Sequence, residues 1–403
     1  MKKIFITGLF LCAITMAQAQ EQIRIWQGGD DTRLTTTEVP FSNDGATFTI
    51  GDKTFETSAI DSITVVHTVT VTYNGEQALV DLGHAPNVTY TTDGAHVSIL
   101  STNTKNELEF VLQGESTQGS LTYDGPLKCK FYLNGLNLKS DRGAAIDIQC
   151  GKRVDLILVP GTENFLVDAP GGTQKAALYC KGHLEVEGSG SLTVTGNTKH
   201  GIASKEYMQL KKSTGTITVN KAVSDAMHVG QYFLMNGGTL TLSGQGGDGL
   251  QLEISTLDDD VTPNPEKEDN GQMFIRGGSL NITADKEDVK GIKVPGDLTV
   301  SGGTFQILAS GDGSKGISVS GNMLVNENDN TTLMQIRATG NIYEDEETED
   351  ESRCMGIKVD GNLTVNAGTI RVANTGKGSR GIRVHGTYTE SSGATVQANV
   401  KTN

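Results

Sequence analysis

The feature that most constrains the fold of this chain is a sequence repeat of about 25 residues. Each copy begins with a small residue that is followed by an apolar, a variable and a second apolar residue, as in Gly316-Ile317-Ser318-Val319. Most intervals between the small residues are 23 to 25 residues long. A fixed period of this size is typical of stacked repeats. The small residue recurs at positions 145, 177, 201, 226, 249, 291, 316, 356 and 381.

Each repeat continues with two more short runs of alternating apolar residues, such as Leu298–Val300 and Thr304–Ile307, and a glycine turn separates the runs. Three short strands cannot bury their apolar faces alone, but stacked repeats bury one continuous core. Helical periodicity is absent, and a propeller blade needs roughly 40 residues or more. The sequence therefore predicts an all-β fold, a right-handed parallel β-helix of about ten coils over residues 67–403.

Two kinds of segment depart from the repeat. Residues 20–66 lack it and are expected to form a small N-terminal β leader or cap, with a hairpin around Gly51-Asp52-Lys53. Residues 67–140 hold irregular strands, which we interpret as the first, degenerate coils. Two long intervals contain the acidic segments 258–269 and 344–351. Because the repeat resumes in phase after each, we expect loop insertions between coils.

The N-terminus predicts a secretory signal peptide over residues 1–19. Met1-Lys2-Lys3 is basic, Ile4–Met16 is an apolar run, and Ala17-Gln18-Ala19 offers small residues to a signal peptidase. We therefore expect a secreted protein, in the periplasm, at the cell surface or outside the cell. No later stretch approaches the roughly 18 apolar residues of a membrane helix, so membrane insertion is not expected.

Composition and motifs argue against several functions. The net charge is −15, and without a concentrated basic surface nucleic acid is an unexpected partner. The chain has no GxSxG, phosphate-loop, HExxH or CxxC motif. By their spacing the histidines form no zinc-type cluster, and His200 and His228 are expected to face solvent. For Cys150 and Cys180, a disulfide and two buried thiols both stay open.

The position before the small residue becomes a vertical column when coils stack. Two adjacent carboxylates, Asp225 and Asp248, repel each other unless a cation lies between them. Calcium prefers such oxygens, and Glu253 and Asp288 lie near the same edge as further ligands. The alternative is that both aspartates cap backbone N–H groups in turns. From residue 200 the column reads His200, Asp225, Asp248, Lys290, Lys315, Met355 and Arg380.

A stripe of cations is the second surface feature. It would suit a polyanion with regularly spaced carboxylates, such as a uronic-acid polymer. The alternative is solvated strand side chains that prevent edge pairing. Tyr207 and Tyr232 lie 25 residues apart and are expected to project outward as a sugar-stacking pair, or as a ladder of two rings. The cations are Lys290, Lys293, Lys315, Lys358, Arg380 and Arg383.

With the repeats aligned, residues 67–403 resemble a family of carbohydrate-binding parallel β-helix proteins that is related in fold to pectate lyases. Some members bind polygalacturonate and cellulose and carry calcium. The resemblance implies a binding role and calcium near Asp225 and Asp248. The family often doubles the aspartate, whereas Ser224 and Gly247 stand here, which removes a possible ligand. The matching stretches are Gly161–Asn164, Gly188–Val194, Gly201–Lys205, Ser224–Val229, Gly247–Glu253, Lys290–Lys293 and Gly311–Ile317.

We thus expect a secreted protein that binds an acidic, polygalacturonate-like polysaccharide with calcium and is not an enzyme. One alternative is a calcium-dependent polysaccharide lyase with Lys290 or Lys315 as its base. A second is a structural or adhesive rod at the cell surface. The sequence sets no oligomeric state.

Overall fold

The computed structural model describes residues 22–28, 30–35, 41–257, 259–326, 332–344 and 351–402. The predicted signal peptide lies outside these residues. The described part of the chain is built of strands, and its helical structure is one short 3-10 turn, η1 (Thr57–Ala59). The all-β prediction is confirmed. Within the described part, no helix has the length and apolar character needed to cross a membrane.

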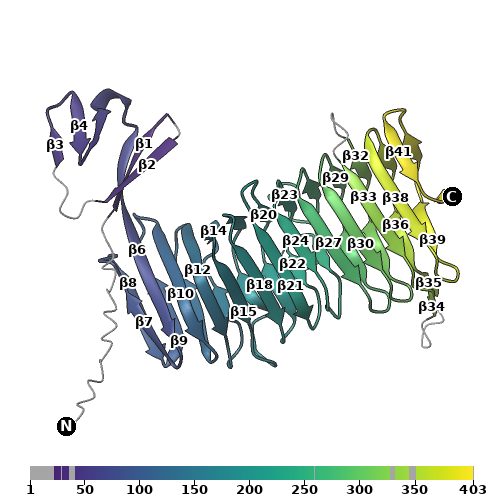
Figure 1. Cartoon of the computed structure of the whole chain (residues 1–403), viewed down its shortest axis with the longest axis horizontal. Coiled ribbons are helices and arrows are strands. Elements are labelled where there is room, and N and C mark those ends of the chain that lie inside the picture. The colour runs from purple at the N-terminus through teal and green to yellow at the C-terminus, as the bar shows by residue number, and fades with distance from the viewer. Residues whose placement is uncertain are drawn as a thin grey trace, which may run out of the picture.

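Most strands lie in three stacks, in which each strand pairs in parallel with a strand of the next repeat (Figure 1). The first stack contains β6 (Ser62–Asn74), β10 (Leu108–Ser116), β12 (Cys129–Lys139), β14 (Val154–Leu158), β17 (Leu184–Glu187), β20 (Met208–Leu210), β23 (Phe233–Met235), β26 (Met273–Ile275), β29 (Leu298–Val300), β32 (Met323–Val325), β37 (Leu363–Val365) and β40 (Tyr388–Glu390). The second stack begins at the end of β12 and continues with β15 (Glu163–Val167), β18 (Ser191–Gly196), β21 (Thr216–Ala222), β24 (Thr239–Leu242), β27 (Ser279–Ala284), β30 (Thr304–Ala309), β33 (Leu333–Ala338), β38 (Gly368–Asn374) and β41 (Ala394–Gln397). The third stack contains β9 (Ala95–Ser101), β11 (Gly119–Asp124), β13 (Ile146–Ile148), β16 (Ala176–Cys180), β19 (His200–Ser204), β22 (Met227–Val229), β25 (Leu250–Leu252), β28 (Lys290–Val294), β31 (Lys315–Val319), β36 (Met355–Val359), β39 (Arg380–Val384) and β42 (Val400–Thr402).

Alternation of apolar and polar residues explains why these segments are strands. In β22 the outer two residues, Met227 and Val229, are buried, whereas His228 between them faces outward. The inward side chains of all three stacks form one continuous core. Full burial of each large apolar side chain contributes about 1.5–3 kcal/mol to stability. The side chains that remain outside form columns, because the strands pair without a shift over most of their length.

The small residue of the repeat marks a close approach between neighbouring repeats in the third stack. A Cβ atom added to Gly291 would lie 2.6 Å from the carbonyl oxygen of Gly316, and one added to Gly316 would lie 2.6 Å from that of Gly356. Real Cβ atoms do not approach an oxygen so closely, so a side chain here would force the backbones apart. The recurrence of glycine is therefore a packing requirement.

The two acidic segments are insertions that leave the pairing in phase, as the sequence predicts. Leu250 of β25 pairs with Ile292 of β28, which follows the first insertion. Ile317 of β31 pairs in the same way with Ile357 of β36, beyond the second insertion. The first insertion leaves the third stack directly after β25. The second contains a two-stranded hairpin, β34 (Ile342–Glu344) and β35 (Glu351–Arg353).

The N-terminal strands form a separate antiparallel unit above the first repeats (Figure 1). It has a small core of its own around Ile25, Ile50 and Phe55. Strands β4 and β5 form the hairpin that the sequence predicts, and β6 runs without a break from this unit into the first stack. The first repeats also contain β7 (Gln77–Asp81) and β8 (Val88–Asp93), which pair antiparallel with β6 and β9. The strands of the unit are β1 (Gln22–Gln27), β2 (Asp30–Thr35), β3 (Phe41–Asn43), β4 (Thr47–Ile50) and β5 (Lys53–Glu56).

The cysteines of the described chain are free thiols in the core. Cys129, Cys150, Cys180 and Cys354 are all buried. The Cys150 thiol donates to the carbonyl oxygen of Leu127 at 3.1 Å. Of the two alternatives for Cys150 and Cys180, the structure agrees with buried thiols rather than a disulfide.

Candidate functional site

The first two predicted calcium ligands serve the backbone. Asp225 accepts the N–H of Asp248 at 2.9 Å, and Asp248 accepts the N–H of Lys290 at 2.7 Å. Each buried carboxylate thus holds the equivalent position of the next repeat, which is the capping role that the sequence leaves open as an alternative. The second oxygen of Asp248 lies 3.3 Å from Nζ of Lys293. Burial raises the pKa of Asp248 in spite of these contacts.

The other two predicted ligands lie among nitrogen atoms. Oε1 of Glu253 is 3.1 Å from Nε2 of His228. Asp288 lies between two lysines, with its carboxylate oxygens 2.7 Å from Nζ of Lys315 and 3.0 Å from Nζ of Lys290. Burial opposes ionisation of Asp288, but hydrogen bonds from Lys315, Ser352 and Lys290 lower its pKa to about 2. The four predicted carboxylates do not converge, so their donor set does not fit the oxygen cage of a calcium ion.

Two histidines gather at Asp225 instead, and for His200 the prediction of a solvent-facing side chain was wrong. His200 is only 1% exposed, so it does not face solvent. Its ring stacks on that of His228 with centroids 4.3 Å apart. The possible ligand atoms of His200, Asp225 and His228 all lie within 4.8 Å of one another. The spacing of the two histidines hides this cluster, because they occupy different positions in neighbouring repeats.

The pocket beside these histidines has a volume of about 490 Å³. His200, His228 and Glu253 line it from the third stack, while Thr256 and Asp260 line it from the first insertion. The insertion thus gives this part of the third stack a wall. Its sequence signal, an acidic segment between two repeats, does not indicate which stack it covers.

The predicted cationic stripe has the expected register but is largely neutralised. Lys290 pairs with Lys315, and Lys358 with Arg383, in adjacent strands. Asp288 binds the first two lysines, as described above, and Nζ of Lys358 lies 2.9 Å from Oδ1 of Asp360. Met355 and Ser318 interrupt the two columns. A polyanion would therefore compete with carboxylates of the protein along most of this stripe.

Lys315, one of the two predicted bases of a lyase, is held in the interior. Its ammonium donates to the carbonyl oxygen of Gly313 at 2.7 Å, to Asp288 and to the hydroxyl of Ser352. Burial lowers its pKa. Because Ser352 belongs to the hairpin of the second insertion, that hairpin covers the amine. Lys315 thus acts as a structural cation between two repeats and the insertion.

The two tyrosines stack on each other as expected. The rings of Tyr207 and Tyr232 lie 4.7 Å apart at an angle of 15°. The ring of His183 stacks on the other face of the Tyr207 ring, with the two ring centroids 4.3 Å apart. The Tyr207 hydroxyl donates to Oε1 of Glu185 at 2.7 Å. These contacts occupy the Tyr207 ring within the protein. The geometry therefore agrees with the ladder of two rings, the alternative to a sugar-stacking pair.

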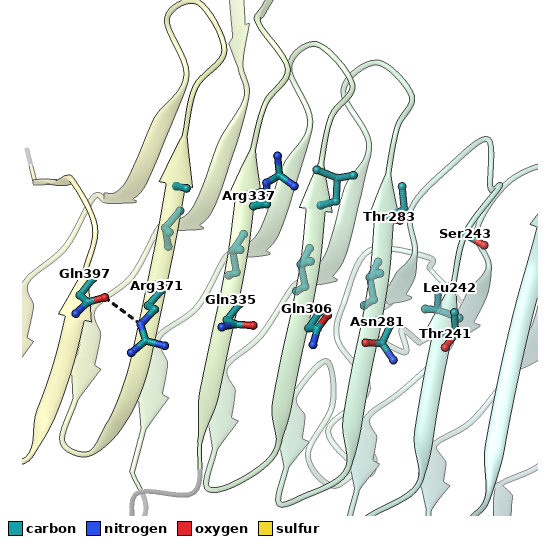
Figure 2. Close-up of a pocket in the computed structure, with 16 residues that line it drawn as sticks. Thr241, Leu242, Ser243, Asn281, Thr283, Gln306, Gln335, Arg337, Arg371 and Gln397 are labelled. Carbon is teal, nitrogen blue, oxygen red and sulfur yellow. Dashed lines mark hydrogen bonds between the residues drawn. The ribbon is translucent and has the colours of Figure 1, made fainter.

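A shallow groove lies on the second stack, with a volume of about 710 Å³ (Figure 2). A column of polar side chains runs along it, one from each strand between β24 and β41. Backbone pairing sets this column in register from strand to strand. Its members are Thr241, Asn281, Gln306, Gln335, Arg371 and Gln397.

The groove presents hydrogen-bonding groups that the protein does not use. Arg371 donates from Nε to Oε1 of Gln397 at 2.9 Å (Figure 2). Within the described part of the chain, the side chains of Asn281, Gln306 and Gln335 make no hydrogen bond. Each primary amide carries two donors and an acceptor with two lone pairs. Adjacent strands place one such group about every 4.8 Å along the groove.

The charge of the groove is positive. Arg337 and Arg371 are its charged lining residues, and no described carboxylate lines it. Leu308 and Ala373 lie in the column beside the amides, together with Thr283 and Arg337, so the groove has some apolar surface next to its polar groups. Sequence reasoning missed this site because it followed the outward residues at the first and second strands of each repeat and not those of the third. The signal was present in the third strand, where amides recur between buried residues.

A model of the family described as "Carbohydrate-binding domain-containing protein" matches residues 93–397. The chain belongs to this family. A relative with the same description, from Acetivibrio thermocellus, is 26% identical over 137 residues, which are 32% of this chain and 47% of the relative. The matched part therefore spans about half the length of that relative. The groove and the histidine pocket both lie within residues 93–397, which the family model matches.

A solved structure described as a polysaccharide lyase-like protein from C. thermocellum, in a gadolinium derivative, is also similar. The two chains are 15% identical. The similarity covers 82% of this chain and 99% of the other, with a TM-score of 0.46.

Proposed function

We propose that this carbohydrate-binding chain holds a polysaccharide along the groove of the second stack. The observation that carries the proposal is the in-register column of unpaired amides at Asn281, Gln306 and Gln335. Their spacing of about 4.8 Å is close to the length that one sugar ring spans in an extended polymer. Each amide would exchange hydrogen bonds with hydroxyl groups, and the neighbouring apolar side chains would contact the ring faces.

We further propose that the polymer is acidic and similar to polygalacturonate. Arg337 and Arg371 support this, because a guanidinium binds a carboxylate through two parallel hydrogen bonds. The absence of carboxylates among the described lining residues removes a source of repulsion. The support thus comes from the groove rather than from the lysine stripe.

Binding rather than catalysis is part of the same proposal. The described lining of the groove holds no histidine, lysine or carboxylate. The two lysines predicted as lyase bases lie in the third stack, and Asp288 binds both. We interpret the three stacks as a right-handed parallel β-helix that displays the groove outside the cell. Calcium binding stays a prediction that rests on the family resemblance alone. The arrangement of the four expected ligands does not support it, because it does not fit that ion.

The test is binding of the purified chain to polygalacturonate and to a neutral glucan, measured by calorimetry. Substitution of both Gln306 and Gln335 by alanine should weaken binding about tenfold or more, since each lost hydrogen bond contributes about 0.5–1.5 kcal/mol. The matched control is Gln209→Ala, an outward amide of the first stack. Equal affinity of the double variant and the control would overturn the proposed groove.

The same samples separate the finer parts of the proposal. Tighter binding of polygalacturonate than of the neutral glucan supports the acidic polymer, and the reverse order contradicts it. Repeating the titration with a calcium chelator tests the calcium prediction. Release of unsaturated product, monitored by ultraviolet absorbance, would show lyase activity and contradict a purely binding role.

A further inference from the structure

The cluster at Asp225 contains a buried histidine whose polar atoms lack a satisfactory partner. Neither ring nitrogen of His200 makes a well-formed hydrogen bond, although the ring is 1% exposed. Its Nδ1 atom lies 3.2 Å from Oδ2 of Asp225, but without hydrogen-bond geometry. An unsatisfied buried polar group is costly and is normally explained by a ligand, a water molecule or a role in chemistry.

Three possible metal-ligand atoms lie close together. Oδ2 of Asp225 lies 3.2 Å from Nδ1 of His200 and 2.9 Å from Nδ1 of His228. Ligand atoms about 2.0–2.1 Å from a tetrahedral zinc ion are themselves roughly 3.3 Å apart. The two distances from Asp225 are close to this value, and the possible ligand atoms of all three residues lie within 4.8 Å of one another. Two imidazoles and one carboxylate suit zinc and similar transition ions, whereas calcium prefers oxygen.

The surroundings of His228 match those of a metal-bound histidine. Its Nδ1 atom faces Asp225, while its Nε2 atom lies 3.1 Å from Oε1 of Glu253. Ligating histidines commonly donate their second ring N–H to a carboxylate, which fixes the tautomer and the ring orientation. Asp225 is fixed as well, because its other oxygen accepts the N–H of Asp248 at 2.9 Å.

We propose that His200, Asp225 and His228 form a binding site for a divalent transition-metal ion, with zinc the best fit. Glu253 orients His228 without binding the ion. Three protein donors leave at least one coordination position of a tetrahedral ion for an oxygen ligand. His200, His228 and Glu253 line the pocket of about 490 Å³, so that position is accessible from the pocket.

The test uses the full secreted chain without a histidine tag and does not depend on carbohydrate binding. Cobalt(II) is titrated as a spectroscopic probe and then displaced with zinc. A tetrahedral cobalt site produces visible ligand-field bands, and the lack of a thiolate charge-transfer band would show that the buried cysteines take no part. We expect one saturable site per chain.

The variants separate ligands from bystanders. His200→Ala and His228→Gln should each weaken zinc binding about 100-fold, and Glu253→Gln about tenfold, as for residues that support a ligand. His385→Ala is the matched control, because His385 also pairs with a carboxylate, at 2.7 Å from Asp360, but belongs to no group of three possible ligands among the described residues. It should change the affinity less than twofold. Thermal melting shows whether each variant is folded.

Several results would overturn the site. One is the absence of saturable zinc or cobalt binding by the wild-type chain. A second is unchanged affinity in folded His228→Gln, and a third is an equal loss in His385→Ala. Preferential binding of calcium at these residues, measured by competition, would also contradict the proposal.

Discussion

The two halves of the second stack share one backbone register and carry different side chains. The outward column of the N-terminal half holds Phe165, Thr193 and Thr218, and Thr241 stands at the junction. From Asn281 onward the same column carries amides and Arg371. The groove begins where the threonines end. Short β-branched side chains stabilise a strand, whereas longer amides leave donors and acceptors for a ligand.

The difference indicates that the outward side chains, and not the backbone that both halves share, determine where the binding surface lies. Buried residues alternate with outward ones in both halves, as in β18 and β30. The outward positions can therefore change without altering the core. Four sets of variants test whether the outward side chains set binding while the backbone packing sets stability.

The largest effect is expected from converting the C-terminal column to threonine. The triple variant Asn281→Thr, Gln306→Thr and Gln335→Thr should lose about 100-fold in polysaccharide affinity, because three hydrogen bonds of about 1 kcal/mol each disappear. Threonine favours strands, so the melting temperature should stay nearly constant. Calorimetry and thermal melting on the same preparation measure both. Retained affinity would show that the amides do not distinguish the two halves.

A substitution at a glycine of the repeat should lower the stability of the protein, whereas the threonine substitutions in the outward column should not. In Gly316→Ala the new Cβ meets the carbonyl oxygen of Gly356, and we expect a loss of about 1–3 kcal/mol in the free energy of unfolding. Chemical denaturation measures this loss. Gly151→Ala is the control, since no atom lies within 4 Å of the added Cβ. Equal stability of the two variants would contradict the packing explanation for the repeated small residue.

The charge of the groove is tested by Arg371→Gln, which continues the amide column and removes the cation. Affinity for an acidic polymer should fall about three- to tenfold at low salt, and its dependence on salt should weaken. Affinity for a neutral polymer should hardly change. A parallel loss for both polymers would mean that Arg371 acts through Gln397 rather than through its charge.

The smallest effect is expected from extending the amide column into the N-terminal half. Thr218→Gln places an amide next to Thr241 and should raise the affinity for long polymers about two- to threefold, the gain from one partly ordered hydrogen bond. Short oligosaccharides that do not reach this strand should bind as before. A fall in affinity for long polymers would show that the groove is closed at β24.

Much of the fold follows from the sequence because one pattern recurs. The inward residues, the outward columns and the in-phase insertions all derive from strand alternation and a period near 25. The antiparallel strands β7 and β8 do not follow from it, since residues 67–140 keep alternation but lose the period. Their pairing depends on how the first edge of the stack is covered.

The candidate sites were harder to predict because neighbours in space decide them. Asp288 looks like a calcium ligand by position, yet it holds Lys290 and Lys315, and Ser352 of a distant hairpin joins them. His200 and His228 come together only through the stacking of repeats. A column alignment of every strand would have found the amides of the groove, but not the partners that neutralise the lysines.

The four buried thiols make refolding of the chain depend on the redox state of its surroundings. In the folded protein Cys129, Cys150, Cys180 and Cys354 are shielded from oxidants by the core. An unfolded chain exposes all four, and in an oxidising compartment any pair joined at that stage would have to be undone before the repeats could stack. Thermal unfolding should therefore be reversible in a reducing buffer and irreversible in air. Whether the native fold is regained then depends on whether the chain refolds before its thiols are oxidised.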